Sequence, residues 1–101
     1  MQKALTGRLM RIKHDHRDLG FMRAEVVFDD SSPLSWGLHV ESPADVDEFR
    51  DHLVAGKSMT LTLITRAGEQ FLGEAAVASV SSTADVAAFV TLCGIGPLQP
   101  A

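Results

Sequence analysis

The stretch that decides the fold spans residues 70–98 and reads QFLGEAAVASVSSTADVAAFVTLCGIGPL. It predicts a hairpin of two strands, at about 70–80 and 86–93, joined by the small polar connection 81–85. A half-buried strand usually carries polar residues on its outward face, yet neither face of the second strand carries a charge. We therefore expect both faces to be covered, one by the core and the other by a helix or a neighbouring subunit.

The chain leaves this hairpin through residues 94–98, GIGPL. The glycines free the backbone, and Pro97 has no amide hydrogen to donate, so we expect the strand pairing to end here. Cys93 has no histidine or lysine beside it that would activate its thiol. We expect a small buried side chain at this position rather than a nucleophile.

Three strands are predicted upstream, at 5–14, 21–28 and 34–40, followed by a helix at about 43–55 and a strand at 59–65. In the first strand the alternation changes parity between Leu9 and Met10, which indicates a bulge or an edge position. The residues expected to point inward from the next two strands are Met22, Ala24, Val26, Phe28, Leu34, Trp36, Leu38 and Val40.

The helix has clear start and stop signals. Ser42 is the expected N-cap, Pro43 the first helical residue, and Gly56 the C-terminal cap. The apolar stripe expected to face the sheet consists of Val46, Phe49 and Leu53. The whole chain, 1–101, is thus predicted to be a single, mainly β domain with one α-helix, in the order β-β-β-α-β-β-β. A small six-stranded barrel and a two-sheet sandwich, either one flanked by the helix, both fit this pattern.

Composition limits the classes of function. The formal charge is −4, with acidic and basic residues interleaved, so charge gives no argument for a nucleic-acid or membrane partner. One cysteine allows no disulfide within the chain, and we do not expect the charged start MQKALTGRLMRIK to be a signal peptide. No apolar run approaches the roughly 18 residues that a membrane span needs. We expect a cytoplasmic protein.

Candidate chemical sites are sparse in this sequence. His14 and His16 are weak candidates for metal ligands, because residues i and i+2 of an extended segment point the same way, but two ligands do not complete a site. The helix carboxylates are expected to be solvated, and no Gly-x-Ser-x-Gly motif surrounds the serines at 79, 81 and 82. We therefore predict no catalytic residues, no metal and no cofactor.

The end of the chain resembles tail-tube and related tail-assembly proteins of long-tailed bacteriophages and prophages. The similarity lies in a Gly-x-Ala-x-Val-x-Ser run at 73–79, a Gly-x-Gly-Pro-Leu ending at 94–98, and LTLITRAG at 61–68. It implies a β-barrel or sandwich flanked by one helix, in a non-enzymatic structural protein that assembles with itself and with other assembly proteins, in the cytoplasm or the virion. The residues expected at its interface are Phe89, Leu92, Gly94, Gly96, Pro97, Leu98 and Trp36.

Two alternatives to a tail component stay open. The element order and the run Leu34–Leu38 resemble PilZ domains, which bind cyclic di-GMP through an Arg-x-x-x-Arg and an Asp/Asn-x-Ser-x-x-Gly motif. Here Arg8 and Arg11 are one residue too close, and the second motif lacks its glycine. The other alternative is a monomeric accessory domain of a larger complex.

Overall fold

The C-terminal hairpin is longer than the sequence predicts. In the computed structural model, which describes residues 5–29, 32–83 and 86–100, it consists of β6 (Gln70–Thr83) and β7 (Val86–Pro100). β7 does not end at Gly94, because Gln99 pairs with Leu72 and Pro100 with Phe71. The expectation that Pro97 ends the pairing is therefore wrong. The register shifts between Leu72 and Glu74, so Pro97 lies in an irregularity where no amide hydrogen is required.

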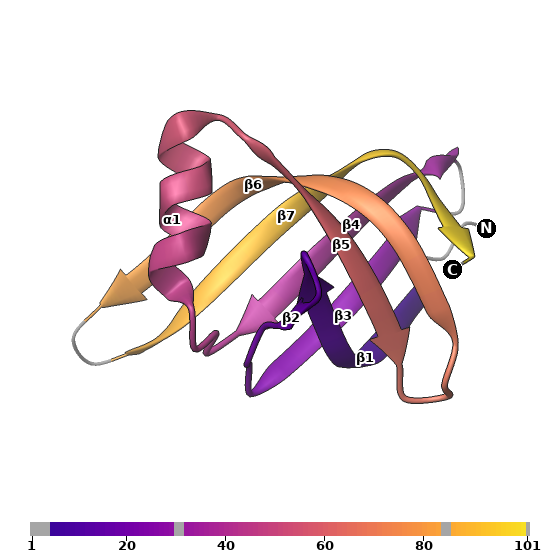
Figure 1. Cartoon of the computed structure of the whole chain (residues 1–101), viewed down its shortest axis with the longest axis horizontal. Coiled ribbons are helices and arrows are strands. Elements are labelled where there is room, and N and C mark those ends of the chain that lie inside the picture. Colours follow the sequence, from indigo (N-terminus) through magenta and orange to yellow (C-terminus); the bar gives the residue numbers. More distant parts are fainter. Residues whose placement is uncertain (1–4, 30–31, 84–85, 101) are drawn as a thin grey trace.

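The strands form a closed antiparallel barrel (Figure 1). Its six strands follow the order β1-β3-β4-β7-β6-β5, and β5 pairs with β1 to close the ring. This confirms the mainly β fold with one helix and decides between barrel and sandwich. Besides β6 and β7, the strands are β1 (Leu5–His14), the short extra strand β2 (Arg17–Asp18), β3 (Arg23–Asp29), β4 (Ser32–Glu41) and β5 (Ser58–Thr65).

A bulge in β1 lets the barrel close. Residues 5–8 pair with β3, whereas residues 9–14 pair with β5, and the register with β5 shifts between Leu9 and Arg11. The parity change in the sequence thus marks a true bulge, which bends the strand from one neighbour to the other. Leu9 and Ile12 both point into the core, while Met10 is 56% exposed instead of sharing the inward face of Ile12.

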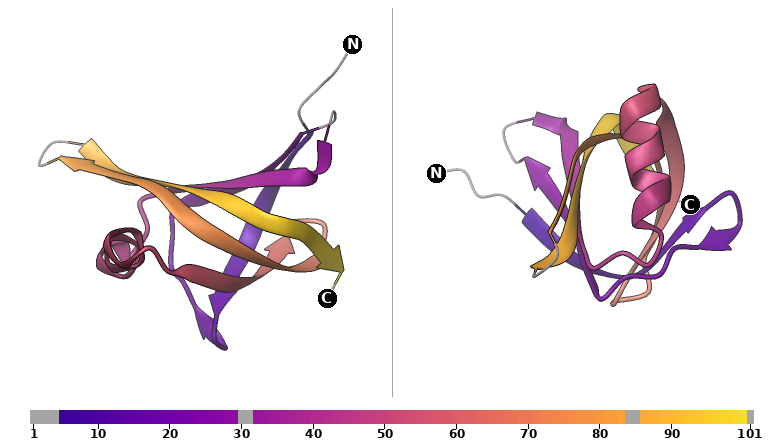
Figure 2. Two further views of the ribbon diagram at one scale, coloured as in Figure 1. Left: turned by 90° about the horizontal axis from the view of Figure 1, so that it is seen from above. Right: turned by 90° about the vertical axis from the view of Figure 1, so that its left-hand side faces the viewer.

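The one helix among the described residues, α1 (Val46–Ala55), lies beside β6 (Figures 1 and 2). Gly56 ends it in the left-handed conformation, and its amide donates to the carbonyls of His52 and Leu53, as predicted. The predicted N-cap is wrong, because Asp45 occupies that position and Ser42 donates its amide to Ala88 of β7. Of the predicted stripe, Phe49 is buried and Val46 half-buried, whereas Leu53 is exposed.

The core fills the barrel with aliphatic side chains from all six strands and with Phe49 of α1. Strand alternation predicted most of it, including Ala24, Val26, Leu38 and Val40. Met22 is an exception, because it precedes β3 and is 80% exposed. The inward orientation expected for Leu34 falls on a side chain outside those that the structure describes.

Candidate interaction surface

Trp36 lies inside the barrel and explains the glycines of the C-terminal motif. Its indole is 5% exposed, and its Nε1 donates a hydrogen bond of 2.9 Å to the carbonyl oxygen of Gly96. A Cβ atom at Gly94 would overlap the indole ring, and one at Gly73 would lie 2.8 Å from its Cζ2 atom and overlap Leu98. The two glycines therefore leave room for the tryptophan.

This packing divides the predicted interface residues into two groups. Trp36 and Leu92 are buried within the chain, and Gly94 and Leu98 are half-buried around the indole. The side chains of Trp36, Leu92 and Leu98 pack within the barrel, and the indole covers Gly94, so these four residues are not free to meet a partner. Exposed members of the set are Phe89, Gly96 and Pro97.

A row of outward-facing residues follows β7. β7 pairs in regular register with β4 from Phe89 to Cys93. Val90 and Leu92 are buried, so the alternate residues between them and on either side share the outer face of the barrel. Phe89 is 37% exposed and Ile95 49%, with Cys93 exposed between them. We call this row, together with Leu72 of β6 and with Pro97, the β7 stripe.

The C-terminal end of the β7 stripe is a shallow depression. Leu72, which is 43% exposed, Ile95 and Pro97 line it together with Thr60, Glu74 and Gln99. Its volume is about 300 Å³. Gly96 has a φ of 73°, a conformation that glycine adopts without steric cost, and this irregularity turns the chain at the edge of the depression.

Cys93 corrects one expectation from the sequence. It was predicted to be buried, but its thiol is exposed on the outer face of β7. Its neighbours across the sheet are Gly37, which has no side chain, and Ala76, whose side chain is one methyl group. Small neighbours on both sides leave the cysteine uncovered.

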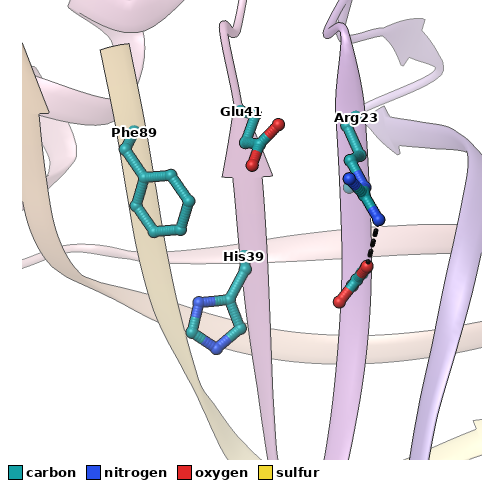
Figure 3. A pocket seen from close by; sticks show the side chains of 6 residues that line it. Arg23, His39, Glu41 and Phe89 are labelled. Atoms are coloured by element: carbon teal, nitrogen blue, oxygen red, sulfur yellow. Dashed lines mark hydrogen bonds and ion pairs between the residues drawn. The ribbon is translucent and has the colours of Figure 1, made fainter. Parts of the chain in front are cut away.

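The other end of the β7 stripe borders a polar pocket of about 270 Å³ (Figure 3). Phe89 lies across from Glu41, and Glu41 lies across from Arg23, so the three come from neighbouring strands. The Phe89 and His39 rings are 5.9 Å apart at an angle of 48°, and Arg23 Nη2 donates to Glu25 Oε1 at 3.3 Å. Aromatic residues are enriched in the core of protein interfaces, whereas the rim is polar, so Phe89 and the charged groups beside it suit the boundary between core and rim.

The histidine candidates do not lie in one extended segment. β1 ends at His14, and both Asp15 and His16 have positive φ, so they form the tight turn between β1 and β2. The geometric premise for two imidazoles facing one ion is therefore absent. Among the residues that the structure describes, no group of three or more His, Cys, Asp or Glu side chains could hold a metal ion.

His14 instead belongs to a cluster that connects this turn to α1. Its Nδ1 lies 3.7 Å from Glu48 Oε1, which also accepts a hydrogen bond from Arg17, and its ring meets His52 edge to face at 5.5 Å. The other carboxylate oxygen of Glu48 is buried and has no hydrogen-bond partner among the residues that the structure describes. We expected Glu48 to be solvated like the other helix carboxylates, because no neighbouring residue in the sequence distinguishes it from Asp47.

Comparison with known proteins identifies no relative of this chain: no family model, no curated protein and no solved structure matches it. Within residues 5–29, 32–83 and 86–100, no helix is long and apolar enough to span a bilayer.

Proposed function

We propose that this chain is a non-enzymatic structural protein that self-associates through the β7 stripe, as a subunit of a tail-like assembly. The observation that carries the proposal is the stripe itself: two aliphatic side chains, an aromatic ring and a thiol lie exposed along one strand and its neighbour. Burying such a surface against another chain removes apolar area from water, which is the main favourable term in protein association.

The position of α1 supports this assignment. The helix packs chiefly on β6, so it leaves the outer face of β7 uncovered from Phe89 to Ile95. The absence of charge on that face of the strand predicts that a helix or a neighbouring subunit covers it. A neighbouring subunit would cover this face within the assembly. At the two ends of the assembly, other assembly proteins would cover it.

A lasting interface buries about 800 Å² on each partner. The accessible surface of this chain is 6140 Å², so such a contact would cover roughly an eighth of it. The stripe would form the apolar centre, and the charged residues around Phe89 would form part of the rim. A ring or tube of identical subunits further requires the stripe to meet a different face of the next copy.

Point substitutions test this function better than truncation. A chain that stops after Cys93 would lose Gly96, the hydrogen-bond acceptor of Trp36, and Leu98, so its behaviour would report on folding. Ile95→Lys and Leu72→Lys place a charge on the stripe while keeping the strands. Val54→Lys is the matched control, because Val54 is an exposed aliphatic residue on α1.

Sedimentation velocity over a range of protein concentrations measures the outcome. We expect the wild type and Val54→Lys to form an oligomer at high micromolar concentration, and both stripe variants to shift toward monomer. A wild-type protein that stays monomeric throughout would contradict self-association and favour an accessory domain. An equal loss of assembly in Val54→Lys would contradict the assignment to the stripe.

A further inference from the structure

Three arginines surround a pocket on the side of the barrel opposite the β6–β7 hairpin. In the ring order, β1 and β3 are neighbours, and each lies three strands from one strand of the hairpin: β1 from β7, and β3 from β6. The pocket has a volume of about 300 Å³, and Arg8, Arg23 and Arg66 line it together with Met10, Met22 and Phe21. In a chain of formal charge −4, this is a local concentration of positive charge.

The backbone holds two of the arginines side by side. The amide of Arg66, just after β5, donates to the carbonyl oxygen of Arg8 in β1 at 3.1 Å. Among the described residues, neither guanidinium has a hydrogen bond or an ion pair. Arg23 pairs with Glu25, which also lies directly across from Arg8. Glu25 is thus near two of the three arginines, and none of the described residues that line the pocket is acidic.

Guanidinium groups that line one pocket repel one another, and a bound anion relieves the repulsion. The guanidinium fork binds carboxylate and phosphate in two-point contacts. A phosphate monoester carries close to two charges and three acceptor oxygens, so it can engage several guanidiniums at once, which a single carboxylate does less well.

The pocket also offers apolar contacts. Met10 points outward because of the β1 bulge, Met22 is largely exposed just before β3, and Phe21 is half-buried beside it. Methionine side chains adapt to irregular shapes and make favourable contacts with aromatic rings. A ligand with an apolar or aromatic group next to its phosphate would use both kinds of side chain.

From this arrangement we propose that the pocket binds a phosphate monoester carrying an apolar or aromatic group, through Arg8 and Arg66 with Arg23 as a third contact. The site shares Arg23 with the polar pocket beside Phe89, whereas Arg8 and Arg66 line only the arginine pocket. The proposal does not depend on self-association. Glu25 competes with the ligand for Arg23.

The test is a titration followed by backbone amide chemical shifts, at low ionic strength because salt screens exposed charges. The probes are phenyl phosphate, inorganic phosphate and benzoate, which separate the contributions of the ring and the phosphate. We expect saturable shifts at residues 8, 23 and 66 with phenyl phosphate, weaker binding of inorganic phosphate, and the weakest binding of benzoate. Equal affinity for benzoate, or no saturation with phenyl phosphate, would overturn the proposal.

Variants then locate the binding. Arg8→Gln and Arg66→Gln should each raise the Kd for phenyl phosphate about tenfold, the effect of losing one charge-assisted contact. Arg11→Gln is the matched control, because Arg11 is an exposed arginine of the same strand that does not line the pocket; its Kd should change less than about twofold. Glu25→Gln should tighten binding. An equal loss in Arg11→Gln, or weaker binding in Glu25→Gln, would contradict the assigned site.

Discussion

Replacing Gly94 with alanine tests the packing of Trp36 most sharply. The added Cβ would overlap an indole that is buried, hydrogen-bonded to Gly96 at 2.9 Å and backed by Gly73 on the next strand. The indole of Trp36 therefore cannot move away from the added Cβ atom. Overpacking of a core lowers the free energy of unfolding by about 1–3 kcal/mol. Because this contact is rigid, we expect Gly94→Ala to lower it by about 3 kcal/mol.

Urea unfolding measures this loss. With a slope of about 1–3 kcal/mol/M, a loss of that size lowers the midpoint by at least about 1 M. Gly56→Ala is the control, because its Cβ would meet nothing within 4 Å while its φ of 66° disfavours any other residue. That backbone strain alone should cost about 1 kcal/mol.

A double mutant decides whether the cost comes from the indole. In a Trp36→Leu background, Gly94→Ala should cost much less than in the wild type, since the overlapping ring is gone. If Gly94→Ala costs less than about 1 kcal/mol in the wild type, or the same amount in both backgrounds, the packing argument is refuted.

Two further predictions concern the helix and the turn that it holds. Asp45 is at the N-cap but makes no side-chain hydrogen bond there. Asp45→Ala should therefore lower the free energy of unfolding by only about 0.5 kcal/mol, because it removes a negative charge from the positive end of the helix dipole. A loss above about 1 kcal/mol in urea unfolding would show that a capping hydrogen bond exists. Arg17→Gln would leave the mostly buried Glu48 carboxylate without its arginine and should lower the free energy of unfolding by about 1–2 kcal/mol. The control Arg11→Gln should lower it by less than about 0.5 kcal/mol. Equal losses for the two arginines would contradict the role of this cluster.

The sequence predicted the elements whose signals are local. Alternation placed Leu38 and Val40 in the core, the parity change near Met10 marked the bulge, and Gly56 marked the end of the helix. The start of the helix was less well predicted. Ser42 resembles an N-cap in the sequence, but its amide donates a hydrogen bond to the carbonyl oxygen of Ala88, a contact that depends on the tertiary fold.

The surface features escaped prediction for the same reason. Pro97 resembles a strand terminator, yet β7 continues because an irregularity accommodates it. Glu48 differs from Asp47 through its contacts with Arg17 and His14, which are distant in the sequence, Arg17 by 31 residues. The pocket of three arginines combines β1, β3 and the end of β5, and no spacing within one segment indicates it.

Cys93 provides the most direct test of assembly through the β7 stripe. It is the single cysteine of the chain and lies exposed between Phe89 and Ile95, so its rate of alkylation by iodoacetamide reports whether this surface is covered. We predict that the rate constant falls as the protein concentration rises through the range in which oligomers form, and that Ile95→Lys removes this dependence. A rate constant that stays the same while sedimentation shows oligomers, or an absence of oligomers altogether, would contradict the account.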